Sequence, residues 1–322
     1  MTETIVVLDM LTEDKAERLR ALLPPGFTLT HATEPGETHM AAIIAEADYA
    51  ISGQVAVSAT VLHAARRLKL LHKWGVGIDN LDVDTARACG IKVARTTGSN
   101  SMAVAEFTLG MMLSALRHIP HGHEGLQRGE WRGGRIRHAP YLLSGKTVGL
   151  IGFGAIGKAV ARLLSGFQCT ILYNKPHPLI TEQEVDLGVQ YAALPDLLAR
   201  ADVVSLHCPL TPRTKGLIDH GALAAMKSTA VLINVARGGV VVEEDLVRAL
   251  RSGAIHAAAC DVFETEPLPE DSTLLRIENL TVTPHLAARA ADTFEPTVKR
   301  MFDNFARVSR GEPLPPLDVV VE

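Results

Sequence analysis

Three residues whose side chains can bind anions or transfer protons each follow a short apolar stretch in the second half of the sequence: Arg237, Glu266 and His285. Such stretches are typical of buried strands, and ligands of open parallel α/β sheets bind outside the carboxyl ends of the strands. A guanidinium can hold a carboxylate or a carbonyl oxygen. An imidazole can give or take a proton near neutral pH, and a carboxylate on its other ring nitrogen orients it. Together the three predict an acid–base site at one sheet edge.

Taken singly, each of these residues also fits an ordinary structural role. Arg237 could cap a helix or form a surface ion pair, Glu266 could be an exposed loop acid, and His285 could be a core histidine. Their shared position after strands, beside a glycine-rich turn, favours the acid–base interpretation.

That turn lies in residues 148–157, which read V-G-L-I-G-F-G-A-I-G and precede a helix-like segment. A strand, a tight G-x-G-x-x-G turn and a helix in this order predict a dinucleotide phosphate site. The first glycine allows the sharp turn, the second lets the backbone approach the pyrophosphate, and the third lets helix and strand pack closely. N–H groups at the helix start would bind the anion. The predicted phosphate-binding residues are Gly152, Gly154, Ala155, Ile156 and Gly157.

The apolar pattern along the chain predicts an α/β fold with two lobes. Short strands alternate with helices from residue 5 to about residue 98, a long helix follows over 101–118, and the alternation restarts at Thr147. Such alternation predicts parallel sheets covered by helices. We therefore expect two Rossmann-like or flavodoxin-like lobes with the active site in the cleft between them. Residues 1–98 and 288–322 would form a discontinuous substrate domain, and residues 99–287 a dinucleotide-binding Rossmann domain.

Composition excludes several classes of partner. The 322 residues are 47% hydrophobic and 21% charged, with a net charge of −4, which gives no general attraction to nucleic acid or anionic membranes. No apolar stretch approaches the roughly 20 residues that span a bilayer. The four cysteines are far apart and show no metal-ligand spacing, so we expect reduced thiols and no metal site. The start of the chain lacks a basic segment, so we expect a cytoplasmic protein without a signal peptide. A basic stretch at 128–138 favours a subunit contact or a solvated arm.

Several motifs in this order resemble those of the D-isomer-specific 2-hydroxyacid dehydrogenases. The resemblance covers nearly the whole chain and is carried by the motifs 73–80, 99–106, 152–157, 207–211, 234–239, 261–267 and 283–285. It implies an enzyme that transfers a hydride between NAD(P)H and a small 2-oxo or D-2-hydroxy acid, assembled as a homodimer. It also implies that His285 is the proton donor, that Glu266 orients it, and that Arg237 clamps the substrate.

The resemblance implies further binding residues on both lobes. Backbone N–H groups of Val76 and Gly77 would bind the substrate carboxylate from the opposite domain, with Lys73 beside them. Asp261 would contact the nicotinamide end of the cofactor. The remaining cofactor contacts are expected at His207, Cys208, Pro209, Val235 and Ala236.

The second strand of the Rossmann pattern departs from the usual fingerprint. A carboxylate is expected about 20 residues after the glycine turn to bind the ribose hydroxyls, but this strand ends in Asn174 and Lys175, with His177 nearby. Without that carboxylate, and with nearby cations, the site favours NADP, while NAD stays possible. Alternatively, Asn174 still binds the ribose hydroxyls and Lys175 is merely exposed.

The substrate-side motifs leave three alternatives. Relatives that oxidise phosphoglycerate carry an arginine near residues 52–54, which read S-G-Q here. A small unphosphorylated acid such as glyoxylate or hydroxypyruvate is therefore expected rather than phosphoglycerate, and we expect no regulatory domain. A phosphite-oxidising relative carries a lysine at the corresponding loop, so Lys73 leaves a phosphite-type dehydrogenase as an alternative function. A non-catalytic, nicotinamide-sensing binding protein is the alternative from another class, because such proteins retain the same three residues.

Overall fold

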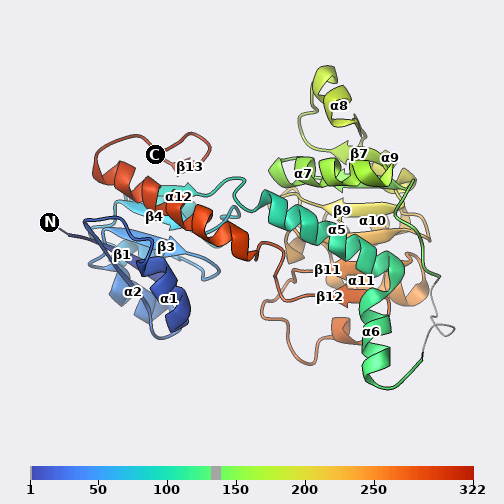
Figure 1. Cartoon of the computed structure of the whole chain (residues 1–322), viewed down its shortest axis with the longest axis horizontal. Coiled ribbons are helices and arrows are strands. Elements are labelled where there is room, and N and C mark those ends of the chain that lie inside the picture. Colours follow the sequence, from blue (N-terminus) through green and yellow to red (C-terminus); the bar gives the residue numbers. More distant parts are fainter. Residues whose placement is uncertain (1, 132–138) are drawn as a thin grey trace. The chain divides into compact units, whose positions relative to one another are not determined.

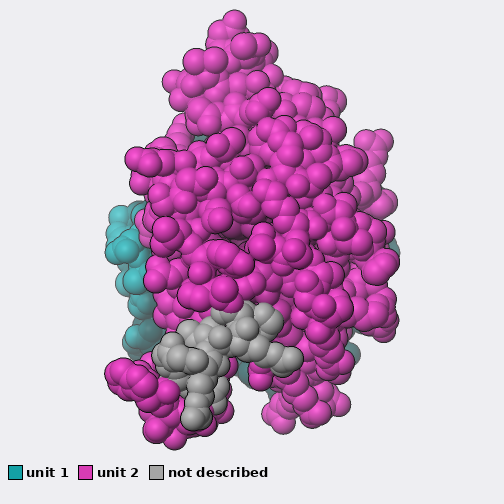
Figure 2. Space-filling view, turned by 90° about the vertical axis from the view of Figure 1, so that its right-hand side faces the viewer, with its two compact units in different colours: residues 1–100, 290–322 teal, residues 101–289 magenta. Residues whose placement is uncertain are grey.

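The computed structural model describes residues 2–131 and 139–322, which divide into two compact α/β units. Unit 1 comprises Met1–Asn100 and Ala290–Glu322, and unit 2 comprises Ser101–Arg289; they are coloured teal and magenta in Figure 2. The predicted α/β fold with two parallel-sheet lobes is confirmed.

Unit 1 is a six-stranded sheet in the order β13-β5-β4-β3-β1-β2, with only β13 antiparallel among these strands (Figure 1). Its strands are β1 (Glu3–Met10), β2 (Phe27–Ala32), β3 (Tyr49–Ser52), β4 (Leu70–Lys73), β5 (Lys92–Arg95) and β13 (Val319–Val321). Its helices are α1 (Glu13–Arg20), α2 (Glu37–Ile44), α3 (Ala59–Ala64), α4 (Val83–Ala88) and α12 (Ala291–Ser309). Successive side chains of β1 enter opposite cores, because strand side chains alternate between the two faces. Val6 and Leu8 join α2 and α3, whereas Ile5 and Val7 join α1 and α12.

Unit 2 is a seven-stranded, fully parallel sheet in the order β12-β11-β10-β9-β6-β7-β8. Its strands are β6 (Thr147–Ile151), β7 (Thr170–Asn174), β8 (Val189–Tyr191), β9 (Val203–Leu206), β10 (Val231–Asn234), β11 (Ala257–Cys260) and β12 (Leu280–Val282). Its helices are α5 (Ser101–Arg117), α6 (Ile119–Gln127), α7 (Ala155–Leu164), α8 (Thr181–Leu187), α9 (Leu194–Arg200), α10 (His220–Ala224) and α11 (Glu243–Ser252). Helices α5 and α7 cover one face of the sheet, and α9, α10 and α11 cover the other. The central strands β6, β9, β10 and β11 are short and almost wholly buried, as expected for a parallel sheet covered on both faces.

The central elements lie where the sequence pattern predicts them, whereas three strands of the two sheets were not predicted. The C-terminal helix α12 packs on the sheet of unit 1. The unpredicted strands β2, β8 and β13 lie at or near sheet edges, where exposed polar residues or short length weaken the apolar pattern. No helix in the described part of the chain has the length and apolar character needed to cross a membrane.

The basic stretch 128–138 is only partly described. Residues 132–138 lie outside the described residues, so the interpretation of this stretch as a subunit contact or solvated arm stays a prediction. Of the rest, Arg128 forms an ion pair with Glu124 on α6, and Trp131 is 85% exposed.

A buried polar network joins β4, α12 and the C-terminal segment of unit 1. Arg300 donates to both carboxylate oxygens of Asp318, and Asn304 donates to the same carboxylate at 3.1 Å. The Asn304 amide also lies 3.0 Å from Nε2 of His72, whose Nδ1 lies 2.9 Å from the carbonyl oxygen of Lys73. Nδ1 therefore donates and Nε2 accepts, so the imidazole is neutral. Burial lowers the pKa of His72 to about 4.

This neutral histidine predicts a pH-dependent stability. Between about pH 6.5 and pH 4 the unfolded chain binds a proton at His72 that the folded protein does not, so stability is full above about pH 6.5 and falls as pH decreases. The free energy of unfolding should decrease by about 1.4 kcal/mol per pH unit in this window. The variant His72→Gln should lack that part of the slope in urea titrations between pH 7 and pH 4.5. His207, whose pKa is also lowered by burial, contributes equally to wild type and to His72→Gln. If the free energy of unfolding falls with pH equally steeply in both proteins, the prediction is wrong.

Candidate active site

The strand order of unit 2 brings the three predicted acid–base residues to one edge of the sheet. Strands β10, β11 and β12 are neighbours and parallel (Figure 1), and Arg237, Glu266 and His285 each follow the carboxyl end of one of them. Nδ1 of His285 donates to Oε2 of Glu266 at 2.7 Å, which is the bond that the sequence interpretation expects. Both side chains are about one-third exposed, so solvent or a ligand can reach them.

The environment of Glu266 keeps its carboxylate charged. Burial alone would raise the pKa of Glu266, but the bonds from His285 and from the Phe263 N–H, with the charges of His285 and Arg237, hold it below its usual range. Oε1 accepts the Phe263 N–H at 3.0 Å while Oε2 accepts His285. A carboxylate held at both oxygens is a fixed anionic partner for a protonated imidazole.

His285 stands in a left-handed backbone conformation, with φ of 52°. This conformation is uncommon for a non-glycine residue, although histidine adopts it more often than most, and neighbouring hydrogen bonds support it here. The fully buried carboxylate of Asp261 supplies that support. Oδ1 of Asp261 accepts from the Thr283 hydroxyl at 2.6 Å and from the Leu286 N–H at 2.8 Å, and Oδ2 accepts from the Ala287 N–H at 2.8 Å. The His285 N–H donates to the Asp261 carbonyl oxygen at 2.9 Å.

Asp261 was expected from the family resemblance to contact the nicotinamide end of the cofactor. In the structure its carboxylate holds the segment that carries His285, and its contact with a cofactor stays a prediction. A strand-end aspartate two residues before an aromatic residue gave no sign of this supporting role in the sequence.

The segment that carries Arg237 is fixed by Asn234 at the end of β10. Oδ1 of Asn234 accepts the Ala236 N–H at 3.1 Å, and its amide nitrogen donates to the Arg237 carbonyl oxygen at 3.0 Å. The Arg237 guanidinium donates to the Ala236 carbonyl oxygen at 2.8 Å. These bonds set the direction in which the arginine leaves the strand.

The next residue, Gly238, touches the loop that holds Glu266. A Cβ on Gly238 would overlap the main-chain carbon and oxygen of Phe263. Beyond this contact, the Glu243 N–H donates to the carboxylate of Glu264 at 3.2 Å, and the Glu264 N–H donates to the carboxylate of Glu243 at 2.6 Å. Burial and the neighbouring Glu264 charge raise the pKa of Glu243, although its bond from the Glu264 N–H opposes the shift. The loops after β10 and β11 are therefore joined at two places, by the contact of Gly238 with Phe263 and by the bonds between Glu243 and Glu264.

The glycine turn lies at the switch point of the sheet, where β6 separates β7 and β8 from the remaining strands. Gly152 has φ of 92°, and a Cβ there would overlap the backbone of His207 and Cys208. A Cβ on Gly157 would lie 2.6 Å from the Gly152 carbonyl oxygen, which explains the close packing of α7 on the turn. At Gly154 a Cβ would meet nothing within 4 Å. The space over the start of α7, at Ala155 and Ile156, is therefore open to an anion.

Tyr173 fixes the loop after β7, where the ribose of the cofactor is predicted to bind. Its hydroxyl donates to Glu184 at 2.7 Å and accepts the Leu179 N–H at 2.7 Å, which fixes the loop between β7 and α8. Burial and the Glu184 carboxylate raise the pKa of Tyr173 to about 12. In that loop the Asn174 amide donates to the Ala192 carbonyl oxygen at 2.9 Å, while no described residue pairs with Lys175.

The other predicted cofactor residues lie at the ends of β9 and β10. Cys208, Val235 and Ala236 are buried, and Pro209 is exposed. Nε2 of His207 lies 3.0 Å from the Ser205 hydroxyl, whereas Nδ1 is buried and has no hydrogen-bond partner among the described residues. Burial lowers the pKa of His207 to about 3, so the ring is neutral and offers one unused nitrogen at the sheet edge.

The predicted substrate residues of unit 1 follow the carboxyl end of β4. The N–H groups of Val76 and Gly77 donate to no described residue. Lys73 is buried, and its ammonium donates to the Gly53 carbonyl oxygen and to Oδ1 of Asn80, the latter at 2.7 Å. Lys73 thus ties the loops after β3 and β4 together.

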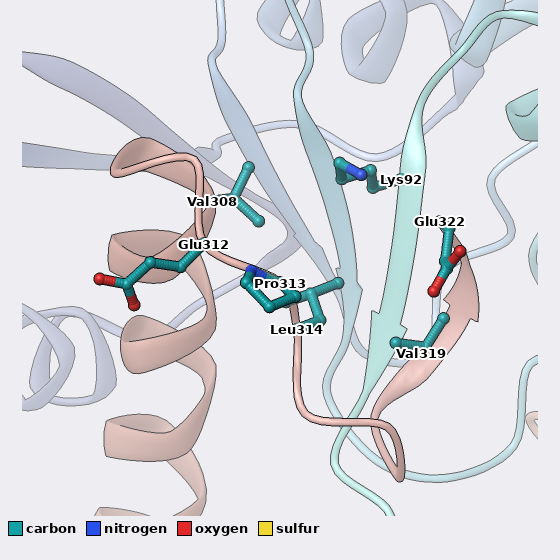
Figure 3. Close-up of a pocket in the computed structure, with 7 residues that line it drawn as sticks. All are labelled: Lys92, Val308, Glu312, Pro313, Leu314, Val319 and Glu322. Carbon is teal, nitrogen blue, oxygen red and sulfur yellow. The ribbon is translucent and has the colours of Figure 1, made fainter.

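A pocket of about 260 Å³ lies elsewhere in unit 1, between β5, β13 and the end of α12 (Figure 3). Apolar side chains of Val308, Leu314 and Val319 line it together with Lys92 and two glutamates. Lys92 begins β5, so this pocket lies near the amino end of that strand, away from the carboxyl end of the neighbouring β4 where Val76 and Gly77 follow. None of the predicted site residues lines it.

The contact between Gly238 and Phe263 predicts that Gly238→Ala disturbs the site. The added methyl group must push apart the loops that carry Arg237 and Glu266, which should lower the free energy of unfolding by about 1–3 kcal/mol. Displacing these side chains should also reduce turnover at least about tenfold. Gly166→Ala is the matched control, because a Cβ there meets nothing within 4 Å. If both variants unfold in urea and turn over alike, the close approach does not position the site.

The chain was compared with models of known protein families. A model described as "D-isomer specific 2-hydroxyacid dehydrogenase, NAD binding domain" matches residues 109–287. This match covers the glycine turn and all three acid–base residues.

Among curated proteins, hydroxypyruvate reductase of Thermotoga maritima is 39% identical over 254 residues, which cover 78% of this chain and 81% of the relative. D-3-phosphoglycerate dehydrogenase of Methanocaldococcus jannaschii is 39% identical over 257 residues, which cover 80% of this chain and 48% of the relative. The matched part of the chain thus spans about half the length of that dehydrogenase.

Among solved structures, NADPH-dependent glyoxylate/hydroxypyruvate reductase of Sinorhizobium meliloti, in complex with NADP and malonate, superposes with a TM-score of 0.84. It is 31% identical, and the match covers 99% of this chain and 97% of the other.

Proposed function

The chain belongs to the D-isomer specific 2-hydroxyacid dehydrogenases, and from this membership we propose that it interconverts a small 2-oxo acid and its D-2-hydroxy acid with a nicotinamide cofactor. The observation that carries the proposal is the 2.7 Å bond between His285 and Glu266, on strand ends neighbouring that of Arg237.

His285 is the proposed proton donor in reduction and proton acceptor in oxidation. Glu266 holds Nδ1, which leaves Nε2 to carry the transferred proton. Because Glu266 stays a carboxylate, it stabilises the imidazolium that reduction requires. Arg237 binds the substrate's carbonyl or carboxylate oxygen and polarises the carbonyl.

The residues of the glycine turn and the strand ends fit a dinucleotide. Open space over Gly154 admits the pyrophosphate, and the N–H groups of Ala155 and Ile156 begin a helix whose N-terminus attracts anions. The unused Nδ1 of His207 offers a polar contact at the same edge. The cofactor, when bound, supplies or accepts the hydride. We propose unit 2 as the dinucleotide-binding domain and unit 1 as the substrate domain, where Val76 and Gly77 bind the carboxylate.

Glyoxylate and hydroxypyruvate are the proposed substrates. A hydroxypyruvate reductase and a glyoxylate/hydroxypyruvate reductase are among the similar proteins, and residues 52–54 offer no arginine for a substrate phosphate. The Lys73 ammonium already binds two oxygen atoms of the protein, which favours a role in holding loops over reading phosphite. Exposed apolar side chains of Ile119, Leu126 and Trp131 support assembly as a homodimer.

Replacement of the acid–base pair tests this proposal directly. His285→Ala should lower kcat for glyoxylate or hydroxypyruvate reduction by about 10²–10⁴-fold, while the Kd for NADPH stays within about threefold of wild type. Glu266→Gln keeps an acceptor for His285 but removes the charge, so the pH profile of reduction should shift toward lower pH. Steady-state rates between pH 5 and pH 9, with cofactor binding followed by fluorescence, measure both effects. Unchanged turnover in His285→Ala would remove that residue from the mechanism.

We also propose that the protein uses both cofactors with a preference for NADPH. Asn174 carries no charge to repel a 2′-phosphate, and Lys175 adds an unpaired cation worth about fivefold in affinity. Lys175→Ala should therefore lower the NADPH-to-NADH ratio of kcat/KM about fivefold. Asn174→Asp should reverse the preference, although it loses the bond to Ala192 and should also lower Tm. Equal use of NADH by wild type, with no change in Lys175→Ala, would contradict this preference.

A further inference from the structure

One half-buried cation of unit 1 has no role in the site as described above. Arg95 is the last residue of β5, and it lies in register with Lys73 of the parallel neighbour β4. We propose that Arg95 is a positioning residue for the substrate carboxylate: from the carbonyl side of the Val76–Gly77 peptide it orients this backbone and strengthens its N–H as a donor. This inference rests on the proposed function and adds the residue that makes the subsite selective for acids.

Contacts from the end of β5 turn two carbonyl groups of the substrate loop toward that strand. The Thr96 N–H and hydroxyl donate to the Gly75 carbonyl oxygen at 3.1 and 3.3 Å. The Arg95 guanidinium donates to the Val76 carbonyl oxygen at 3.3 Å.

The direction of these carbonyls sets the direction of the N–H groups. In a planar trans peptide the C=O and the N–H point opposite ways. With the carbonyls of Gly75 and Val76 held toward β5, the N–H groups of Val76 and Gly77 point away from it. Neither N–H has an acceptor among the described residues. Two successive free N–H groups at the carboxyl edge of a parallel sheet form a small concave site for an anion.

The charge of Arg95 is not compensated within the described protein. No described carboxylate forms an ion pair with Arg95, and its Nε is buried without a hydrogen-bond partner. Arg300 of the same unit shows the usual arrangement, since both oxygens of Asp318 accept from it. A half-buried guanidinium without a counter-ion is costly, and its bond to the Val76 carbonyl oxygen offsets part of that cost.

This arrangement identifies the chemical class that unit 1 recognises. The subsite combines two N–H donors with a cation on the carbonyl side of one of their peptides, which suits a carboxylate rather than an ester or amide. The enzyme should therefore reduce 2-oxo acids and discriminate against their neutral esters and amides, and Arg95 should provide most of that discrimination.

The test measures binding separately from turnover. Oxamate, an unreactive 2-oxo acid analogue with one carboxylate, is titrated calorimetrically into the protein saturated with NADPH. Arg95→Met keeps the stem but removes the charge, and it should raise the oxamate Kd and the glyoxylate KM at least about tenfold with kcat within about threefold. Arg95→Lys should recover part of this loss, because it restores the charge without the planar fork. The Kd of NADPH should stay unchanged in both.

Two further variants separate charge from loop geometry. Thr96→Val removes one of two bonds to Gly75 and leaves the charge, so its oxamate Kd should rise by no more than about threefold. Arg66→Met makes the same change of charge at an exposed position before the amino end of β4, and it should bind oxamate like wild type.

The inference and the proposed function fail in different ways. If wild type binds oxamate and reduces glyoxylate but Arg95→Met does both equally well, the inference is wrong and the proposed function stands. If Arg95→Met loses NADPH affinity and oxamate affinity together, Arg95 has only a structural role. If wild type neither binds oxamate nor reduces any 2-oxo acid, the proposed function itself fails.

Discussion

The buried carboxylate of Asp261 is the interaction on which the rest of the candidate site depends. It accepts three hydrogen bonds from the segment 283–287, and the same residue's carbonyl oxygen accepts the His285 N–H. These bonds hold His285 in a left-handed conformation that is uncommon for a non-glycine residue. In this conformation Nδ1 of His285 donates to Glu266, which leaves Nε2 outside that bond. The acid–base pair is thus a product of backbone placement as much as of the two side chains.

The two units arrange their candidate anion-binding groups by different means. In unit 2, the Glu266 carboxylate is held at both oxygens, by the Phe263 N–H and by His285, and Arg237 adds a cation. In unit 1, main-chain carbonyls are turned toward β5, which leaves the N–H groups of Val76 and Gly77 without acceptors. Both arrangements are set before any substrate arrives. Such preorganisation reduces the rearrangement that binding and proton transfer would otherwise require.

The sequence predicts those features that depend on local pattern. The glycine turn, the alternation of short buried strands with helices, and the placement of Arg237, Glu266 and His285 after strands all follow from neighbouring residues. The pairing of β13 with β5 joins segments more than 200 residues apart, and three valines alone do not specify it. The contact of Gly238 with Phe263 and the support of His285 by Asp261 likewise depend on which strands become neighbours. Strand order is a property of the whole chain, so these features became visible only in the structure.

Asn174 and Arg95 each bond to a main-chain carbonyl group, so replacing either side chain also changes a backbone contact. The Asn174 amide donates to the Ala192 carbonyl oxygen and so links the ends of β7 and β8. A carboxylate at this position could not donate that bond and would face a carbonyl oxygen, which repels it. Asn174→Asp therefore alters the contact with Ala192 together with the charge. Arg95 shows the same coupling in unit 1, because its guanidinium is at once a cation and the donor that holds the Val76 carbonyl. Exchanging either residue changes charge and backbone contacts together.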